Sequence, residues 1–372
     1  YRTWMLYAII PYVLTFILCF TNPNISTTMK VVFVTAMYIL YDMASTAYQV
    51  PQGSLANVMT SNTQEYSLLG VFRSYGTSIS GLIMGLIAVP LIIFFGGSMS
   101  SAAGFTKTAI VVAAVGGICM LVGVLGTRER VHVSTVSTPI KQSIKAFMAN
   151  RPSQILCGMV VFANAGIVFP LTWTSYYSLY YLGDERMIPT IISVMCAMPL
   201  LGLLFVPALT KKISKKGVLA VGNSFLIISG LVYILAGKST PLILLAAVLS
   251  GLNLAFTFST FWAAVSDTCN YGEWKTGSRA TGFIYAMGVF AMKVGSAIVS
   301  FGIGAFLQRL GYDASRGMDQ LPSVQQGVYL ANGVTLAAIG IIALLFVLFY
   351  KLDKKTMDQI EVELTERRAQ QA

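Results

Sequence analysis

The sequence predicts an all-α membrane protein whose helices cross a lipid bilayer. Hydrophobic residues make up 56% of the 372 residues, charged residues only 10%, and the mean hydropathy is +0.73. A soluble domain carries roughly a quarter charged residues, so this chain has too little charge to cover soluble domains. The apolar residues also form long blocks instead of the short alternating segments of a strand barrel. Lipid is therefore the expected solvent.

The helical spans follow from these blocks, because a spanning helix needs about 20 mostly apolar residues. The longest polar interval between blocks, residues 127–152, separates four helices from six. Many transporters consist of two related six-helix halves, so we expect two N-terminal helices to be absent from this chain, and the lack of an initiator Met agrees. The ten expected spans are 4–20, 30–51, 66–95, 105–126, 153–182, 188–209, 217–236, 241–266, 279–310 and 323–350.

The chain is accordingly divided into residues 1–126 as the remainder of an N-terminal bundle, 127–152 as a central loop, 153–350 as a six-helix bundle and 351–372 as a tail. Placing the central loop in the cytoplasm puts seventeen of the 25 Lys and Arg residues on that side and six outside. This bias sets membrane orientation and predicts a multi-pass protein of the cell (inner) membrane with a cytoplasmic C-terminus. The loop placement of the charges argues against nucleic acid as a partner.

The tail is interpreted as a surface amphipathic helix or a frayed end, with Met357, Ile360 and Val362 at near-helical spacing.

Three ionisable residues lie inside expected spans, where charges are costly and usually functional. They are Asp42, Arg73 and Lys293. Arg73 has a simpler alternative, because a long side chain near a helix end reaches the interface. Asp42 has another, as a purely structural partner of Arg73 or Lys293.

The helix that contains Asp42 carries a polar and aromatic stripe, which lipid would not tolerate, so it is expected to face a cavity or a partner helix until Pro51 ends or kinks it. Further aromatic residues follow Trp173, where an interfacial belt is an equal alternative, and surround Phe258 and Trp262. Aromatic faces with polar neighbours suit sugars. The stripe consists of Tyr38, Tyr41, Asp42, Ser45, Tyr48, Gln49 and Gln52.

The segment from Ser266 to Arg279, SDTCNYGEWKTGSR, followed by Gly282 and Lys293, resembles the signature of the glycoside–pentoside–hexuronide:cation symporters. This is the melibiose-permease-like branch of the major facilitator superfamily. The segment YQVP at Tyr48–Pro51, with Arg73 following, is a second match, and the resemblance extends over essentially the whole chain. It implies a major facilitator fold of two helical bundles, with ten spans present of an expected twelve.

The resemblance also implies roles for single residues. Arg73 matches the family arginine of the fifth helix, and Lys293 matches the lysine of the eleventh, which is placed near the cation and sugar sites. Phe258 stands where melibiose permease has a sugar-site tryptophan, and Trp262 matches an aromatic residue of other members. The charged residues Asp267, Glu273 and Arg279 match the cluster that gates the cytoplasmic side.

Two departures from the family pattern matter. Gln49 stands where melibiose permease has a sugar-binding aspartate, and Asn270 replaces the second aspartate of the signature. Asp42 lies two turns before Gln49 on the same face, so we hypothesise that it supplies the lost carboxylate. The family's acidic cation ligands are outside this chain, so the coupling ion stays open between Na⁺ and H⁺.

The predicted function is cation-coupled symport of a glycoside, pentoside or hexuronide by alternating access, with no cofactor, in a protein that functions as a monomer. A major facilitator for a lipid or other amphipathic solute is the alternative. An enzyme is not expected, because no nucleophile or metal constellation is present, and a non-transporting sensor would tolerate substitution of Lys293. The link Lys211–Gly217 is either a conformational latch or simple positive charge at the membrane surface.

Overall fold

A computed structural model of the chain describes residues 1–59, 63–98, 101–129, 140–277, 281–313, 316–317, 319–353, 356–357, 359–360, 362–364 and 366. Arg279, expected at the gate, lies outside these residues. The chain forms two compact units, the first comprising Tyr1–Phe72 and Met84–Val136 and the second Arg73–Ile83 and Ser137–Ala372.

The first unit contains α1 (Arg2–Cys19), α2 (Thr27–Met59), α4 (Ala102–Gly126) and most of α3 (Thr63–Gly96), whose middle segment Arg73–Ile83 groups with the second unit. Helix α1 packs on both α2 and α4. Helix α2 does not end at Pro51 but continues to Met59.

The polar stripe of α2 has two edges with different surroundings in this unit. Tyr41 and Tyr48 stack on Tyr12 of α1, with ring centroids 5.4 Å and 6.1 Å apart. Tyr38 and Gln49 are exposed. At 100° per residue, Tyr41 and Tyr48 lie on one edge of the stripe and Tyr38 and Gln49 on the other. The tyrosines therefore hold α1 and α2 together, and the other edge of the stripe is exposed within this unit.

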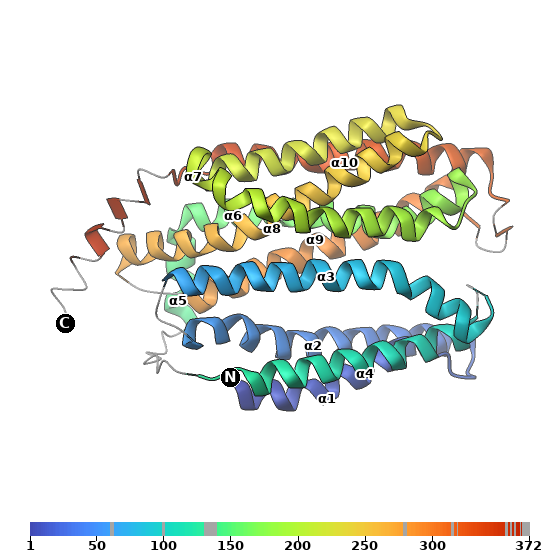
Figure 1. Cartoon of the computed structure of the whole chain (residues 1–372), viewed down its shortest axis with the longest axis horizontal. Coiled ribbons are helices and arrows are strands. Elements are labelled where there is room, and N and C mark those ends of the chain that lie inside the picture. Colours follow the sequence, from blue (N-terminus) through green and yellow to red (C-terminus); the bar gives the residue numbers. More distant parts are fainter. Residues whose placement is uncertain are drawn as a thin grey trace. The chain divides into compact units, whose positions relative to one another are not determined.

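The second unit contains the short helix α5 (Ile140–Ala149), α6 (Arg151–Tyr176) with its π-helical end η1 (Tyr177–Leu182), α7 (Met187–Ala236), α8 (Thr240–Thr276), α9 (Thr281–Leu310) and α10 (Pro322–Phe349). Figure 1 shows the long helices of this unit running side by side. Helix α7 packs on α8 and α10, and α6 packs on α9 and α10.

Helix α7 contains two spans, because its backbone breaks at Ser214, where φ is 66° and ψ is 166°. A left-handed φ is unfavourable for a residue with a side chain. The break lies inside the link Lys211–Gly217, two residues after the start of the span Lys212–Ala236, which follows the span Met187–Thr210.

Close helix crossings in this unit depend on small residues, as is usual between membrane helices. A Cβ built on Gly230 of α7 would lie 2.6 Å from the carbonyl oxygen of Gly333 on α10. Such a contact leaves no room for a side chain. The backbones of α7 and α10 therefore approach each other at the closest distance that packing allows.

The aromatic residues after Trp173 do not all form an interfacial belt. Trp173 and Tyr177 are both 1% exposed, and they belong to the main hydrophobic core of the second unit. The Trp173 indole donates a hydrogen bond to the Val328 carbonyl, and the Tyr177 hydroxyl donates to that of Gly237. These bonds satisfy the polar atoms that burial removes from water.

Ten helices among the described residues are long and apolar enough to cross a membrane, which confirms the expected spans within a few residues at most ends. Within the interval 127–152, the described residues include a helix, because α5 occupies Ile140–Ala149 and buries Ser143, Ala146 and Phe147. This burial follows from an amphipathic face with i, i+3 and i+4 spacing.

Candidate functional site

An aromatic cluster joins α8 and α9 in the second unit. Phe258 and Trp262 lie four residues apart on α8, so they share a helical face, and their ring centroids are 6.4 Å apart in an edge-on arrangement. Tyr285 of α9 stacks on Trp262 at 5.7 Å with an interplanar angle of 11°. Phe261 packs edge-on against the same indole at 5.0 Å.

A cation completes this cluster. The guanidinium carbon of Arg73, on the α3 segment that groups with the second unit, lies 6.0 Å from the centroid of the Trp262 ring. A cation at this distance is attracted by the π electrons with about 0.5–1 kcal/mol at an exposed site. The structure thus brings Arg73, Phe258 and Trp262 together, as expected for a common site, and adds Tyr285.

The indole N–H of Trp262 is buried and has no hydrogen-bond partner among the described residues. A buried donor without an acceptor costs roughly 1–3 kcal/mol. A solute hydroxyl that accepted this bond would remove that cost. The cluster therefore offers flat apolar faces, one buried donor and one cation, which are the groups that a polyhydroxylated ring requires.

Lys293 lies half-buried on α9, two turns after Tyr285, where α9 meets α6. The Asn164 amide of α6 donates hydrogen bonds to the Met292 carbonyl at 2.8 Å and to the Ser296 hydroxyl at 2.9 Å. These bonds bracket Lys293 and fix the rotation of α9 at this level. Asn164 is a positioning residue that was not among the expected site residues. A polar amide inside the expected span 153–182 could have indicated it.

Asp42 and Gln49 belong to the first unit. Asp42 is half-buried, and its carbonyl accepts a hydrogen bond from the Thr46 hydroxyl at 2.7 Å. Gln49 is exposed and its amide donates to the Ser45 hydroxyl at 2.9 Å. The two residues share one face of α2, as the sequence analysis expected from their spacing.

An ion pair connects Asp267 of α8 to the link Lys211–Gly217 of α7. Lys215, one residue after the break in α7, contacts both carboxylate oxygens of Asp267 at 2.7 Å. The side chain of Asp267 is only 15% exposed and that of Lys215 34%. The link therefore ties α7 to α8 through a partly buried pair, which simple positive charge at a membrane surface does not explain.

Tyr350 lies in the same region, directly after α10. Burial raises the pKa of Tyr350, and the nearby charge of Asp267 raises it further. The phenol therefore stays protonated at physiological pH. Its hydroxyl has no hydrogen-bond partner among the described residues.

Other signature residues contact the junction of α5 and α6 and the tail. The Asn150 amide donates to the Thr268 carbonyl at 2.7 Å, and the Lys275 ammonium donates to the Ala149 carbonyl at 3.1 Å. The Trp274 indole donates to the Glu363 carboxylate at 2.7 Å. Glu273, the neighbouring gate residue, is half-buried.

One face of the described tail residues is buried, which agrees with a surface amphipathic helix and not with a frayed end. Ile360 and Leu364 are 2% and 4% exposed, and Met357 packs on the second core cluster of this unit. Val362 was expected on the apolar face but is 60% exposed. The expectation for Val362 was wrong because Ile360 and Leu364, four residues apart, define the buried face.

We expect Leu364→Asp to release the tail, because it places a charge on a buried side of the chain. Hydrogen exchange of the tail amides should become at least about tenfold faster, because a buried carboxylate costs more than the 1.4 kcal/mol that tenfold represents. Val362→Asp is the matched control and should leave exchange unchanged. Equal protection in the two variants would contradict the docked tail.

No group of three or more His, Cys, Asp or Glu residues that could hold a metal ion occurs in the described part of the chain.

Comparisons with known proteins agree with this architecture. A family model described as "MFS/sugar transport protein" matches residues 1–354. The isoprimeverose transporter of Lactiplantibacillus pentosus is 31% identical over 362 residues, which cover 95% of this chain and 74% of that protein. A putative sulfoquinovose importer of Escherichia coli strain K12 is 28% identical over 99% of this chain and 79% of its own length.

Among solved structures, the major facilitator transporter FucP in its outward conformation superimposes with a TM-score of 0.63 at 12% identity, covering 95% of this chain and 84% of its own. A likeness at this identity supports the fold alone. The fold expected from the signature around Asp267 is thereby confirmed, and so is the expectation of a transporter instead of an enzyme.

Proposed function

The chain belongs to the family of MFS/sugar transport proteins, and from this premise we propose that it carries a sugar across the cell membrane by cation-coupled symport. The observation that supports a sugar most directly is the cluster around Trp262. It combines stacked aromatic faces, a buried donor and the Arg73 cation. A purely apolar solute would leave the buried indole donor of Trp262 unsatisfied.

In the proposed mechanism the sugar ring packs on the aromatic faces of Phe258 and Trp262, while Arg73 and Lys293 supply charge beside it. Asp42 and Gln49, on one face of α2, are further polar groups for the solute. Cation binding changes the charge balance around Arg73 or Lys293 and favours closure around sugar, because a ligand shifts a two-state equilibrium toward the state that it binds better.

The gate is proposed at the cytoplasmic side, where Asp267, Glu273 and Arg279 lie in the signature. The Lys215–Asp267 pair fixes the link of α7 on α8, and α5 and the tail pack around the end of the same helix. Alternating access then requires these contacts to change between the inward-closed and inward-open states. Basic residues concentrate in these segments, which supports a cytoplasmic C-terminus.

The test is counterflow in proteoliposomes that contain the full-length protein. A panel of radiolabelled glycosides, pentosides and uronides is measured in Na⁺ and in K⁺ at two pH values, with protein-free liposomes as the control. We expect exchange of at least one sugar, faster in Na⁺ or at the lower pH. Exchange of no sugar under any condition would refute the proposal.

Trp262→Phe should raise the KM of the transported sugar about fivefold, because it keeps an aromatic face and removes a donor whose hydrogen bond contributes about 1 kcal/mol. The maximal rate should change less. Trp274→Phe removes an indole N–H that bonds to the tail instead, and it should leave this KM unchanged. An unaltered KM in Trp262→Phe would exclude the indole donor from sugar binding.

Asp42→Asn tests whether Asp42 supplies the carboxylate that Gln49 lacks. We expect uptake to fall about tenfold or more and its cation dependence to disappear, because a neutral amide cannot balance a bound cation. Asp42→Glu keeps the charge and should retain the cation dependence. Unchanged uptake with unchanged cation dependence in Asp42→Asn would remove Asp42 from the coupling mechanism.

A further inference from the structure

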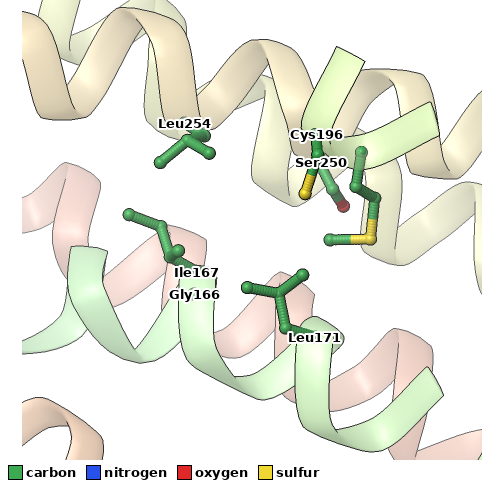
Figure 2. A pocket seen from close by; sticks show the side chains of 7 residues that line it. Gly166, Ile167, Leu171, Cys196, Ser250 and Leu254 are labelled. Carbon is green, nitrogen blue, oxygen red and sulfur yellow. The ribbon is translucent and has the colours of Figure 1, made fainter. Parts of the chain in front are cut away.

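The pocket between α6, α7 and α8 is too small for a solute. Figure 2 shows Ile167 and Leu171 of α6 facing Leu254 of α8 across it. Its volume is about 20 Å³, which is room for about one water molecule. The feature of this unit that calls for a further partner lies instead on its surface, on the short helix α5.

One face of α5 holds this helix against the ends of α6, α8 and α9. Ala146 and Phe147 are buried there, and the Phe147 ring packs edge-on against Phe283 of α9 with their centroids 5.8 Å apart. The Gln154 amide of α6 donates hydrogen bonds to the last turn of α5. These contacts fix the rotation of α5 about its axis, so the residues on its other faces have defined directions.

An apolar stripe runs along α5 beside the packed face. Ile140, Ile144 and Met148 follow one another at intervals of four residues and are 76%, 46% and 66% exposed. At 100° per residue they lie next to the buried residues around the axis, and the exposed Lys141 and Lys145 lie next to the stripe on its other side. The order around the helix is therefore packed, apolar and basic.

Helix α5 lies at the depth of the membrane surface. Only Asn150 separates it from the candidate span that begins at Arg151, and the Asn150 side chain caps that span by accepting a hydrogen bond from the Ser153 N–H. Figure 1 shows α5 running across the direction of the long helices near their ends. A helix in this orientation keeps its residues close to one depth, so the apolar stripe runs along the interface between lipid and water.

The charge of α5 is entirely positive. Its ten residues include Lys141 and Lys145 and no Asp or Glu. Helices that lie in a membrane interface have this composition, because apolar side chains enter the acyl boundary while lysines reach the phosphates. An anionic phospholipid supplies both complements, an acyl chain for the stripe and a negative headgroup for the ammonium groups.

We propose that α5 is an interfacial helix that binds anionic phospholipid. The acyl chain packs on Ile140, Ile144 and Met148, and the phosphate lies at Lys141 and Lys145. The occupant of the stripe is thus a membrane lipid, and neither another segment of this chain nor a second copy of it. This inference does not depend on which solute the protein carries.

Photo-crosslinking from the stripe tests the occupant. The full-length protein, with the photoreactive p-benzoylphenylalanine in place of Ile144, is reconstituted in vesicles of equal phosphatidylglycerol and phosphatidylcholine. After illumination, mass spectrometry should find the α5 peptide joined to lipid, in protein that keeps the wild-type thermal midpoint. The matched control has the same replacement at Gln142, which is exposed and about 160° away around the helix.

The control position should give much less lipid product than position 144. A crosslink from position 144 to another segment of the chain or to a second copy would overturn the proposal. No more lipid product at position 144 than at position 142 would overturn it as well.

The captured lipid tests the role of the two lysines. A lysine near an anionic surface contributes a preference of about fivefold, so phosphatidylglycerol should exceed phosphatidylcholine among the products by up to about 25-fold. Lys141→Gln combined with Lys145→Gln should bring this ratio close to one. A ratio of one with both lysines present, or an unchanged ratio after both are replaced, would refute the recognition of anionic lipid.

A second pair of substitutions controls for net charge. Lys238→Gln combined with Arg309→Gln removes the same charge from two exposed positions. Lys238 precedes α8 and Arg309 ends α9, whereas α5 lies at the Thr268 end of α8 and the Phe283 end of α9. This variant should therefore keep the wild-type ratio of the two lipids. An equal loss of preference in both double variants would show that α5 has no specific part in lipid binding.

Discussion

Asp267→Asn is expected to lower sugar uptake about tenfold, because it breaks the pair that holds the link of α7 on α8. Lys215 contacts both oxygens of Asp267 at 2.7 Å, and the carboxylate is largely buried. An exposed pair contributes up to about 1 kcal/mol, whereas removing one partner of a fully buried pair costs about 3–5 kcal/mol. An intermediate effect of about 1.4 kcal/mol corresponds to the tenfold change. The measurement is initial uptake normalised to protein in the membrane.

The double variant Lys215→Asp with Asp267→Lys should recover part of this loss, since it restores opposite charges across the same contact. Two control variants show whether the loss of uptake is specific to the ion pair. Lys212→Ala removes an exposed cation from the same link, and Tyr350→Phe removes a buried hydroxyl that has no described partner. Both should keep uptake near the wild-type rate. Additive losses in the double variant would show that the pair does not control the gate.

Gly295→Ala is expected to lower the free energy of unfolding of the second unit. A Cβ on Gly295 would overlap the carbonyl oxygen of Val161 and lie 3.4 Å from the Ala165 nitrogen, both in the backbone of α6. Backbone atoms cannot rotate away, so α6 and α9 must separate. Overpacking of this kind costs about 1–3 kcal/mol or more, and separation would also stretch the bonds of Asn164 beside Lys293.

The measurement is the thermal midpoint of the purified protein, with uptake measured in parallel. Gly302→Ala and Gly304→Ala on the same helix are matched controls, because a Cβ at either position meets no atom within 4 Å. Replacing an unobstructed helical glycine by alanine stabilises by about 0.5–1 kcal/mol. A Gly295→Ala protein as stable as these controls would contradict the close crossing of α6 and α9.

Several features of the structure could be predicted from local sequence patterns. The ten spans, the positions of Asp42, Arg73 and Lys293 within or beside them, and the family signature at Asp267 were all visible in the sequence. The helical face shared by Tyr41, Tyr48 and Gln49 was visible too. The sequence did not show how this face divides. The edge with the tyrosines packs on α1, and the edge with Gln49 is exposed.

The same limit applies to the gate. The sequence favoured simple positive charge for the link and named no partner for Lys215, because its carboxylate lies 52 residues away on another helix. The tail likewise presented several apolar residues at plausible spacing. Packing against the second unit buries Ile360 and Leu364 and leaves Val362 exposed.

By itself the sequence determined that the chain lies in lipid, where its helices run and which family it belongs to. Hydropathy and short motifs are properties of contiguous residues. The tertiary structure decided which faces meet: the stack of Tyr285 on Trp262, the hydrogen bonds of Asn164 to α9 and the Lys215–Asp267 pair. These depend on the rotation and depth of each helix, which packing sets between residues that are distant in the chain.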